Sequence, residues 1–254
     1  CGSIMSGSAM GLSHHFDLEK SANQQIVSLL AQIPSLFSCS YDEEQDFIQQ
    51  LADSIEEYAD HTAYQNVANH LKTAKSIVLK DISIAFSTAL KDSGQVKTLA
   101  SEQALNFHTD HLSIVTDKEL GYQLKLEAGF SESRNNFDKA LIQSGWKFCK
   151  AAKQSEVHKK LDAVRPGFLA LILQSALDNH IEDKQVARIA YRFIGGNFFH
   201  QLSEHYDHLT PALTDLAEAL TETQKVTETK QAQKENPFTQ NDLPRVQVDE
   251  MEEY

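Results

Sequence analysis

The segment Pro166-Gly-Phe-Leu-Ala-Leu-Ile-Leu173 is the most apolar stretch of this sequence. Proline at the first position of a helix loses no hydrogen bond, so Pro166 predicts a helix start. The residues from Phe168 to Leu173 are apolar without interruption, so this helix has no polar face to present to water. We therefore expect it to form the buried centre of the domain. The apolar run is far shorter than the ~20 residues that a membrane-spanning helix needs.

Apolar residues recur at helical spacing on both sides of this segment, which predicts a mainly α fold. Pro34 is expected to end the first helix, and Ser40 with Glu43 has the spacing of a capping box at the start of the second. Gly195-Gly196 is expected to end a later helix. The pattern predicts a multi-helix globular bundle of about eight helices. They cover about residues 16–32, 42–60, 63–91, 133–151, 181–194, 197–209 and 211–221, together with the helix that Pro166 opens and that contains Phe168 to Leu173. A short further helix is expected over 157–164.

Residues 112–130 depart from this spacing. Leu112 and Ile114 alternate with polar neighbours, and every second residue from Leu120 to Leu126 is again apolar. A period of two is typical of strands, so we expect a small β-hairpin near 112–130, connected at residues 117–119. The alternative is a helix that carries Leu120, Leu124 and Glu127.

Both ends of the chain lack a pattern that could build a core. The predicted organisation is a flexible tether over residues 1–14, a single helical domain over 15–223 and a disordered polar tail over 224–254. Such polar ends cannot offset their ordering entropy by burial. The tail could dock on a partner through Val246 and Val248 or through its acidic end, and the alternative is a solvated tail.

The first residues, Cys1-Gly2-Ser3, resemble the mature N-terminus of a bacterial lipoprotein, a class in which the N-terminal cysteine carries the lipid. The uncharged Gly, Ser, Ala and Met residues that follow agree with a tether. The resemblance implies a lipid on Cys1 and a place in the cell envelope, at the outer membrane facing the periplasm. A cloning scar or a fragment would also begin in this way, and the protein would then be cytoplasmic.

The other two cysteines are Cys39 and Cys149. If the protein is exported, an oxidising compartment would allow these two residues to form one disulfide. Cys39 lies in a segment that we expect to be a loop, which favours this pairing. The alternative is two buried free thiols. No CxxC motif occurs, so neither a thioredoxin-like site nor a zinc ribbon is predicted.

The formal net charge of −13 weighs against two kinds of partner. A protein of this charge repels the phosphate backbone of nucleic acids and anionic lipid headgroups at long range. We therefore expect no nucleic acid partner, and membrane attachment only through a lipid on Cys1.

Histidines concentrate in the segment 200–208. On a helix, His200, Glu204 and His208 lie at positions i, i+4 and i+8, and imidazole with carboxylate at that spacing could hold a divalent metal. These residues fall almost opposite the apolar stripe of the same helix, so the alternative is a solvated polar face.

Motifs of catalysis are absent from the sequence. It contains no G-x-S-x-G, no P-loop, no G-x-G-x-x-G and no HExxH, so no catalytic residue and no cofactor is predicted. We expect a lipid-anchored envelope protein that acts without catalysis, by binding another protein in an accessory, assembly or neutralising role. The alternatives are a helical protein that binds a divalent metal and a cytosolic helical adaptor.

Overall fold

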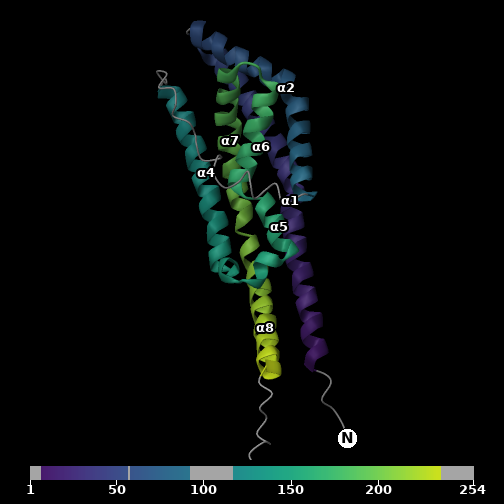
Figure 1. Cartoon of the computed structure of the whole chain (residues 1–254). Helices are drawn as coiled ribbons and strands as arrows, with labels where there is room; N and C mark the ends of the chain where they lie inside the picture. The colour runs from purple at the N-terminus through teal and green to yellow at the C-terminus, as the bar shows by residue number, and fades with distance from the viewer. Residues whose placement is uncertain (1–6, 57, 92–116, 236–254) are drawn as a thin grey trace, which may run out of the picture.

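The computed structural model describes residues 7–56, 58–91 and 117–235, and their regular structure is entirely helical (Figure 1). This confirms the mainly α prediction and the bundle-like packing, whereas the helix count differs. The α-helices are α1 (Gly7–Ser54), α2 (Tyr58–Lys91), α4 (Asp117–Gln143), α5 (Glu156–Ala163), α6 (Pro166–His180), α7 (Lys184–Tyr206) and α8 (Leu209–Glu235). Two short 3-10 helices, η1 (Trp146–Phe148) and η2 (Ala151–Gln154), connect α4 to α5. None of the described helices is long and apolar enough to cross a membrane.

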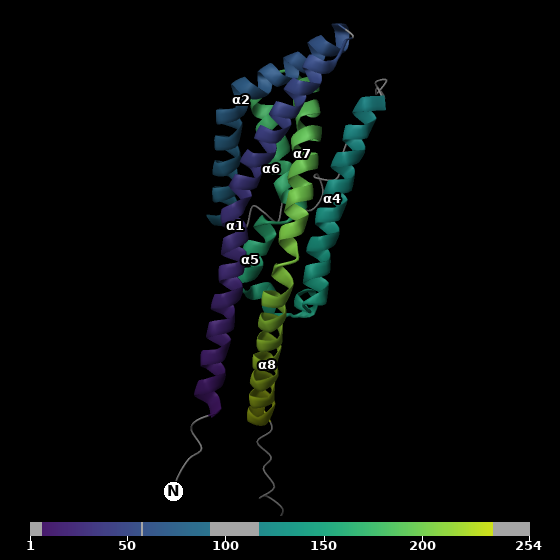
Figure 2. The same cartoon turned by 180° about the vertical axis from the view of Figure 1, so that it is seen from behind.

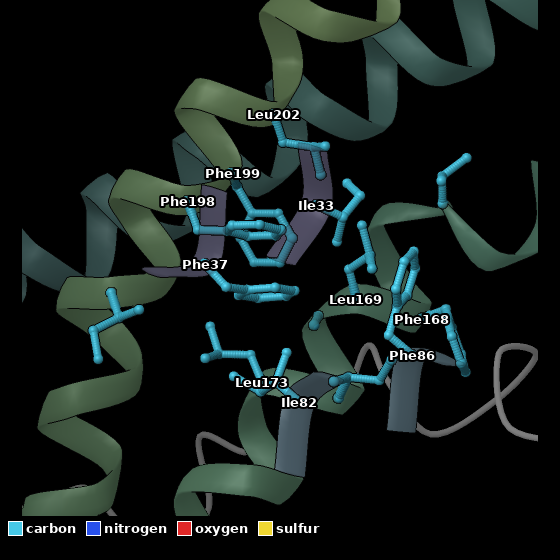
Figure 3. Close-up of a cluster of buried hydrophobic side chains, with 14 of the residues drawn as sticks. Ile33, Phe37, Ile82, Phe86, Phe168, Leu169, Leu173, Phe198, Phe199 and Leu202 are labelled. Carbon is cyan, nitrogen blue, oxygen red and sulfur yellow. The ribbon is translucent and has the colours of Figure 1, made fainter. Parts of the chain in front are cut away.

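Helix α6 begins at Pro166, as predicted, and contributes much of the core. Its buried side chains meet those of α1, α2 and α7 in one cluster (Figure 3). Within this cluster the rings of Phe37 and Phe198 stack with their centroids 3.9 Å apart. One side of α6 stays open, because Leu171 is only half-buried and Ser175 is exposed.

Helix α1 is a single helix of 48 residues and includes Pro34, so the predictions of a break at Pro34 and of a cap at Ser40 are wrong. A proline inside a helix costs about 3 kcal/mol. Each fully buried large apolar side chain contributes about 1.5–3 kcal/mol, so a few of them outweigh that cost. The buried face of α1 includes Ile26, Leu29, Leu30, Ile33, Phe37, Tyr41 and Ile48.

The predicted hairpin is also wrong, because its second half, residues 117–130, is part of helix α4. Residues 112–116 lie outside the described residues. On α4, Tyr122 contacts Phe193 of α7 and Leu126 is buried, whereas Leu120 and Leu124 are 49% and 55% exposed. Two different faces of one helix therefore carry apolar residues, and this arrangement imitates the period of a strand.

Gly195 and Gly196 do not end a helix, since both lie within α7. They allow α4 to approach closely: a Cβ atom on Gly195 would lie 2.9 Å from Leu126 Cδ1. Facing them on α4, a Cβ atom on Gly129 would lie 2.9 Å from the carbonyl oxygen of Gly196. The glycines set the distance between the two helices. One helix, α7, covers residues 184–206, where two helices over 181–194 and 197–209 were expected.

The helices extend beyond the predicted boundaries of the domain at both ends. Helix α1 begins at Gly7, within the predicted tether, and α8 continues to Glu235, within the predicted tail. Both views show these two portions projecting from the same end of the bundle (Figure 2). Residues 224–235 are rich in Lys, Gln and Glu, which have a high helix propensity. Val246 and Val248 lie outside the described residues.

The close approach of α4 and α7 gives a testable pair of variants. Gly129→Ala should destabilise the protein by about 1–3 kcal/mol, because the new methyl group meets backbone atoms of α7 that cannot move aside. Gly121→Ala, on the same helix, has nothing within 4 Å and should stabilise it by about 0.5–1 kcal/mol. Urea unfolding measures both, and equal effects would contradict the role assigned to Gly129.

Candidate functional site

The predicted metal ligands are not brought together. His200, Glu204 and His208 are all exposed, and α7 ends at Tyr206, so His208 follows in a turn instead of continuing the helical face. His200 Nδ1 lies 3.2 Å from Glu132 Oε2 of α4. The described residues contain no group of three or more His, Cys, Asp or Glu side chains that could hold a metal ion.

The predicted disulfide is not formed in the structure, in which Cys39 and Cys149 are free thiols. Cys39 lies within helix α1 and is exposed, so the loop expected around it does not exist. Cys149 is buried against α8, with its Sγ atom 3.9 Å from the carbonyl oxygen of Ala217. Cys1 lies outside the described residues, and its lipid and the envelope location stay predictions.

A polar cluster joins α1 to α4 and α7. Glu44 is buried, and its Oε1 atom lies 3.2 Å from Lys125 Nζ. Burial raises the pKa of the Glu44 carboxyl above its ordinary value, although Lys125 acts in the opposite direction. The neighbouring Glu43 accepts hydrogen bonds from Asn197 Nδ2 at 2.7 Å and from Gln201 Nε2 at 3.0 Å. Both carboxylates therefore have hydrogen-bond or ion-pair partners on other helices, and the cluster connects α1, α4 and α7.

A concave site lies in a groove between α2 and α6, with a cavity volume of about 290 Å³. Small residues produce the hollow: Ala85 and Ala89 on α2 face Ala176 on α6. Ile172 and Phe168 complete an apolar floor and wall. The polar lining residues of the groove are Asp81, Thr88, Ser175 and Asn179.

Asp81 also joins the two helices at one end of this groove, since its Oδ2 atom lies 3.1 Å from His180 Nε2. A histidine bonded to a carboxylate beside a serine raises the question of a catalytic triad. Ser175 and His180 are five residues apart on α6, so their side chains point in directions about 140° apart. No hydrogen bond joins them within the described part of the chain. Among the described residues the Asp81–His180 pair has no hydrogen bond to a serine, and it joins α2 to α6.

The apolar surface continues from the groove onto α2. Ile77 and Ile84 are 50% and 53% exposed. They lie seven residues apart and flank Asp81, so they share the side of α2 that borders the groove. Two large aliphatic side chains beside an apolar groove form a surface that water solvates poorly.

Comparison of this chain with known proteins found no matching family, no matching curated protein and no matching solved structure.

The buried carboxylate gives a pH-dependent prediction. Because the pKa of Glu44 is raised in the folded state, the folded protein holds this proton more strongly than the unfolded chain. The free energy of unfolding should therefore decrease as the pH rises from the ordinary value near 4.5 through the raised folded-state value. Glu44→Gln should be more stable than the native protein at pH 7, and the difference should disappear near pH ~4.

Urea unfolding at several pH values measures this difference. The control is Glu218→Gln on α8, which removes the same charge from an exposed position. A pH-independent difference for Glu44→Gln, equal to that of the control, would contradict the assignment.

Proposed function

We propose that this chain is a non-catalytic protein-binding domain, and that the groove between α2 and α6 receives the apolar face of a helix from a partner protein. The groove, with its apolar floor and polar edges, is the observation that carries the proposal. The proposal does not depend on a lipid at Cys1, and it applies equally to an envelope protein and to a cytosolic adaptor.

The extent of the groove favours a helix as its occupant. Its lining spans Asp81 to Ala89 on α2 and Phe168 to Asn179 on α6. At 1.5 Å per residue, these stretches are about 12 Å and about 17 Å long. They match two to three turns of an amphipathic helix, which binds such grooves through side chains at positions i, i+3 or i+4, and i+7.

The chemistry of the groove specifies the partner further. Ala85, Ala89 and Ala176 leave room for large aliphatic or aromatic side chains, and Ile77 with Ile84 offers further apolar contact at the edge. These contacts would supply most of the affinity, because apolar burial dominates the centres of such interfaces.

Charge favours a partner with basic residues beside its apolar face. Asp81 stands at the edge of the groove, and the whole chain carries a net charge of −13. This field would attract a basic partner and speed its association. We therefore propose an amphipathic helix with flanking lysines or arginines as the occupant.

The test uses the full chain as bait for a displayed library of amphipathic 18-residue peptides with lysine flanks. Selected peptides are labelled, and their affinity is measured by fluorescence anisotropy. Ala85→Trp fills the groove and should weaken binding more than tenfold, a loss of about 1.4 kcal/mol. Ile84→Lys, at an exposed position that does not disturb the core, should also weaken it by repelling the basic flanks.

The matched control is Leu124→Trp, which adds the same side chain to the exposed face of α4. It should leave the affinity unchanged. The proposal fails if no peptide is selected, or if selected peptides bind Ala85→Trp and Ile84→Lys as tightly as the native protein.

A further inference from the structure

Positive charge gathers in one short segment of this acidic protein. Residues 146–165 contain Lys147, Lys150, Lys153, Lys159, Lys160 and Arg165, against only Glu156 and Asp162. The segment therefore has a net charge of +4 (six minus two), whereas the whole chain carries −13. It comprises η1, η2 and α5, which lead from α4 to α6.

Burial in the first part of this segment follows a period of three. Trp146, Cys149 and Ala152 are buried, and the residue that follows each of them is an exposed lysine. The stretch consists of the two short 3-10 helices η1 and η2, and the backbone is extended at Cys149 between them. Lys147, Lys150 and Lys153 are thus three exposed lysines within seven residues of the chain, and together they are called here the lysine row.

The lysine row differs from the cations that follow it. Lys159 pairs with Glu156, Arg165 with Asp162, and Lys160 donates a hydrogen bond to Asn23 Oδ1. No described residue forms an ion pair with a member of the lysine row. The fold therefore leaves this part of the charge available to an external anion.

An aromatic side chain projects beside the lysine row. Phe148 is 73% exposed, although it is flanked by the buried Trp146 and Cys149. Ile142, 46% exposed, lies close by in the chain, because its carbonyl oxygen accepts a hydrogen bond from the backbone of Gly145 in the same turn. This part of the chain thus exposes two large apolar side chains and three lysines that have no ion-pair partner among the described residues.

The buried side of the segment contacts two neighbouring helices. Trp146 Nε1 donates to His158 Nδ1 at 3.4 Å, and Cys149 packs on α8. The buried side chains of Trp146 and Cys149 therefore anchor the segment to α5 and α8.

We infer that the lysine row and Phe148 form a docking surface for a membrane that contains anionic phospholipids. The lysines would contact lipid phosphates, and Phe148 would enter the boundary between headgroups and acyl chains, where aromatic side chains are favoured. None of these residues lines the α2–α6 groove, and the inference does not rest on the proposed function.

The chemistry favours lipid over an acidic protein. Carboxylates are recognised most specifically by the planar fork of arginine, whereas the free cations here are lysines, which act as point charges. An acidic peptide would also leave Phe148 uncovered unless it supplied an apolar side chain at that position. A membrane interface offers phosphate and hydrocarbon side by side.

The overall negative charge does not prevent this docking. Charges are screened over about 8–10 Å at physiological ionic strength, so distant acidic residues contribute little at a surface that touches the lysine row. The net charge would instead orient the protein, with only this segment turned toward the membrane.

Vesicle co-sedimentation of the full chain tests the inference. The native protein should bind vesicles of 70:30 phosphatidylcholine and phosphatidylglycerol, should not bind vesicles of pure phosphatidylcholine, and should dissociate at high salt. The triple variant K147Q/K150Q/K153Q should lose at least tenfold in affinity. Phe148→Ser should lose severalfold and keep its salt dependence.

Matched controls on other faces separate this surface from general effects of charge and polarity. K72Q/K80Q/K91Q removes three exposed lysines from α2, and Leu124→Ser removes an exposed apolar side chain from α4. Both should bind within twofold of the native protein. Fluorescence of Trp146, the single tryptophan, reports that each variant is folded.

Three results would overturn the inference. The native protein could fail to bind the anionic vesicles, or the α2 triple variant could lose as much affinity as the lysine-row variant. The third is binding of a ten-residue glutamate peptide through the lysine row without binding of vesicles, which would assign this surface to an acidic protein partner.

Discussion

The burial of helix α6 is the constraint on which the rest of the structure depends. The run from Phe168 to Leu173 is apolar without interruption, so other helices must cover most of this part of α6. Helices α2 and α7 pack against it, and side chains of α1 meet those of α6 in the cluster of Figure 3. The enclosure is incomplete where the small residues Ala85 and Ala89 of α2 face α6, and the groove lies there. The candidate site is therefore a consequence of how the core is closed.

Tertiary packing overrides local helix breakers at two places. Pro34 lies within α1, because the buried face of that helix continues on both sides of it. Gly195 and Gly196 lie within α7, where the absence of side chains allows α4 to approach. In both cases the gain comes from contacts with residues distant in the chain, and these exceed the local cost of the proline or the glycines.

The distribution of charge connects the two proposed surfaces. Acidic residues prevail over the chain as a whole, whereas the segment from η1 to α5 is basic. A groove with Asp81 at its edge suits a basic helix, and the lysine row suits an anionic membrane. The two surfaces call for partners of opposite charge, so neither partner would compete for the other's position.

Residue spacing predicts three features of this protein: its helical class, the start of α6 at Pro166 and the apolar faces of the long helices. These features are predictable because they depend on neighbours within a turn or two. The sequence does not predict the continuity of α1 and α7, the helical state of residues 117–130 or the free thiols. Each of these depends on which distant helix covers a given face. Leu120 and Leu124 illustrate the difference: their spacing suits a strand as well as a helix, and the packing of Leu126 against Gly195 selects the helix. The groove and the exposure of the lysine row also depend on tertiary packing. Whether a side chain lines a hollow or is exposed is determined by which neighbouring residues are buried beside it.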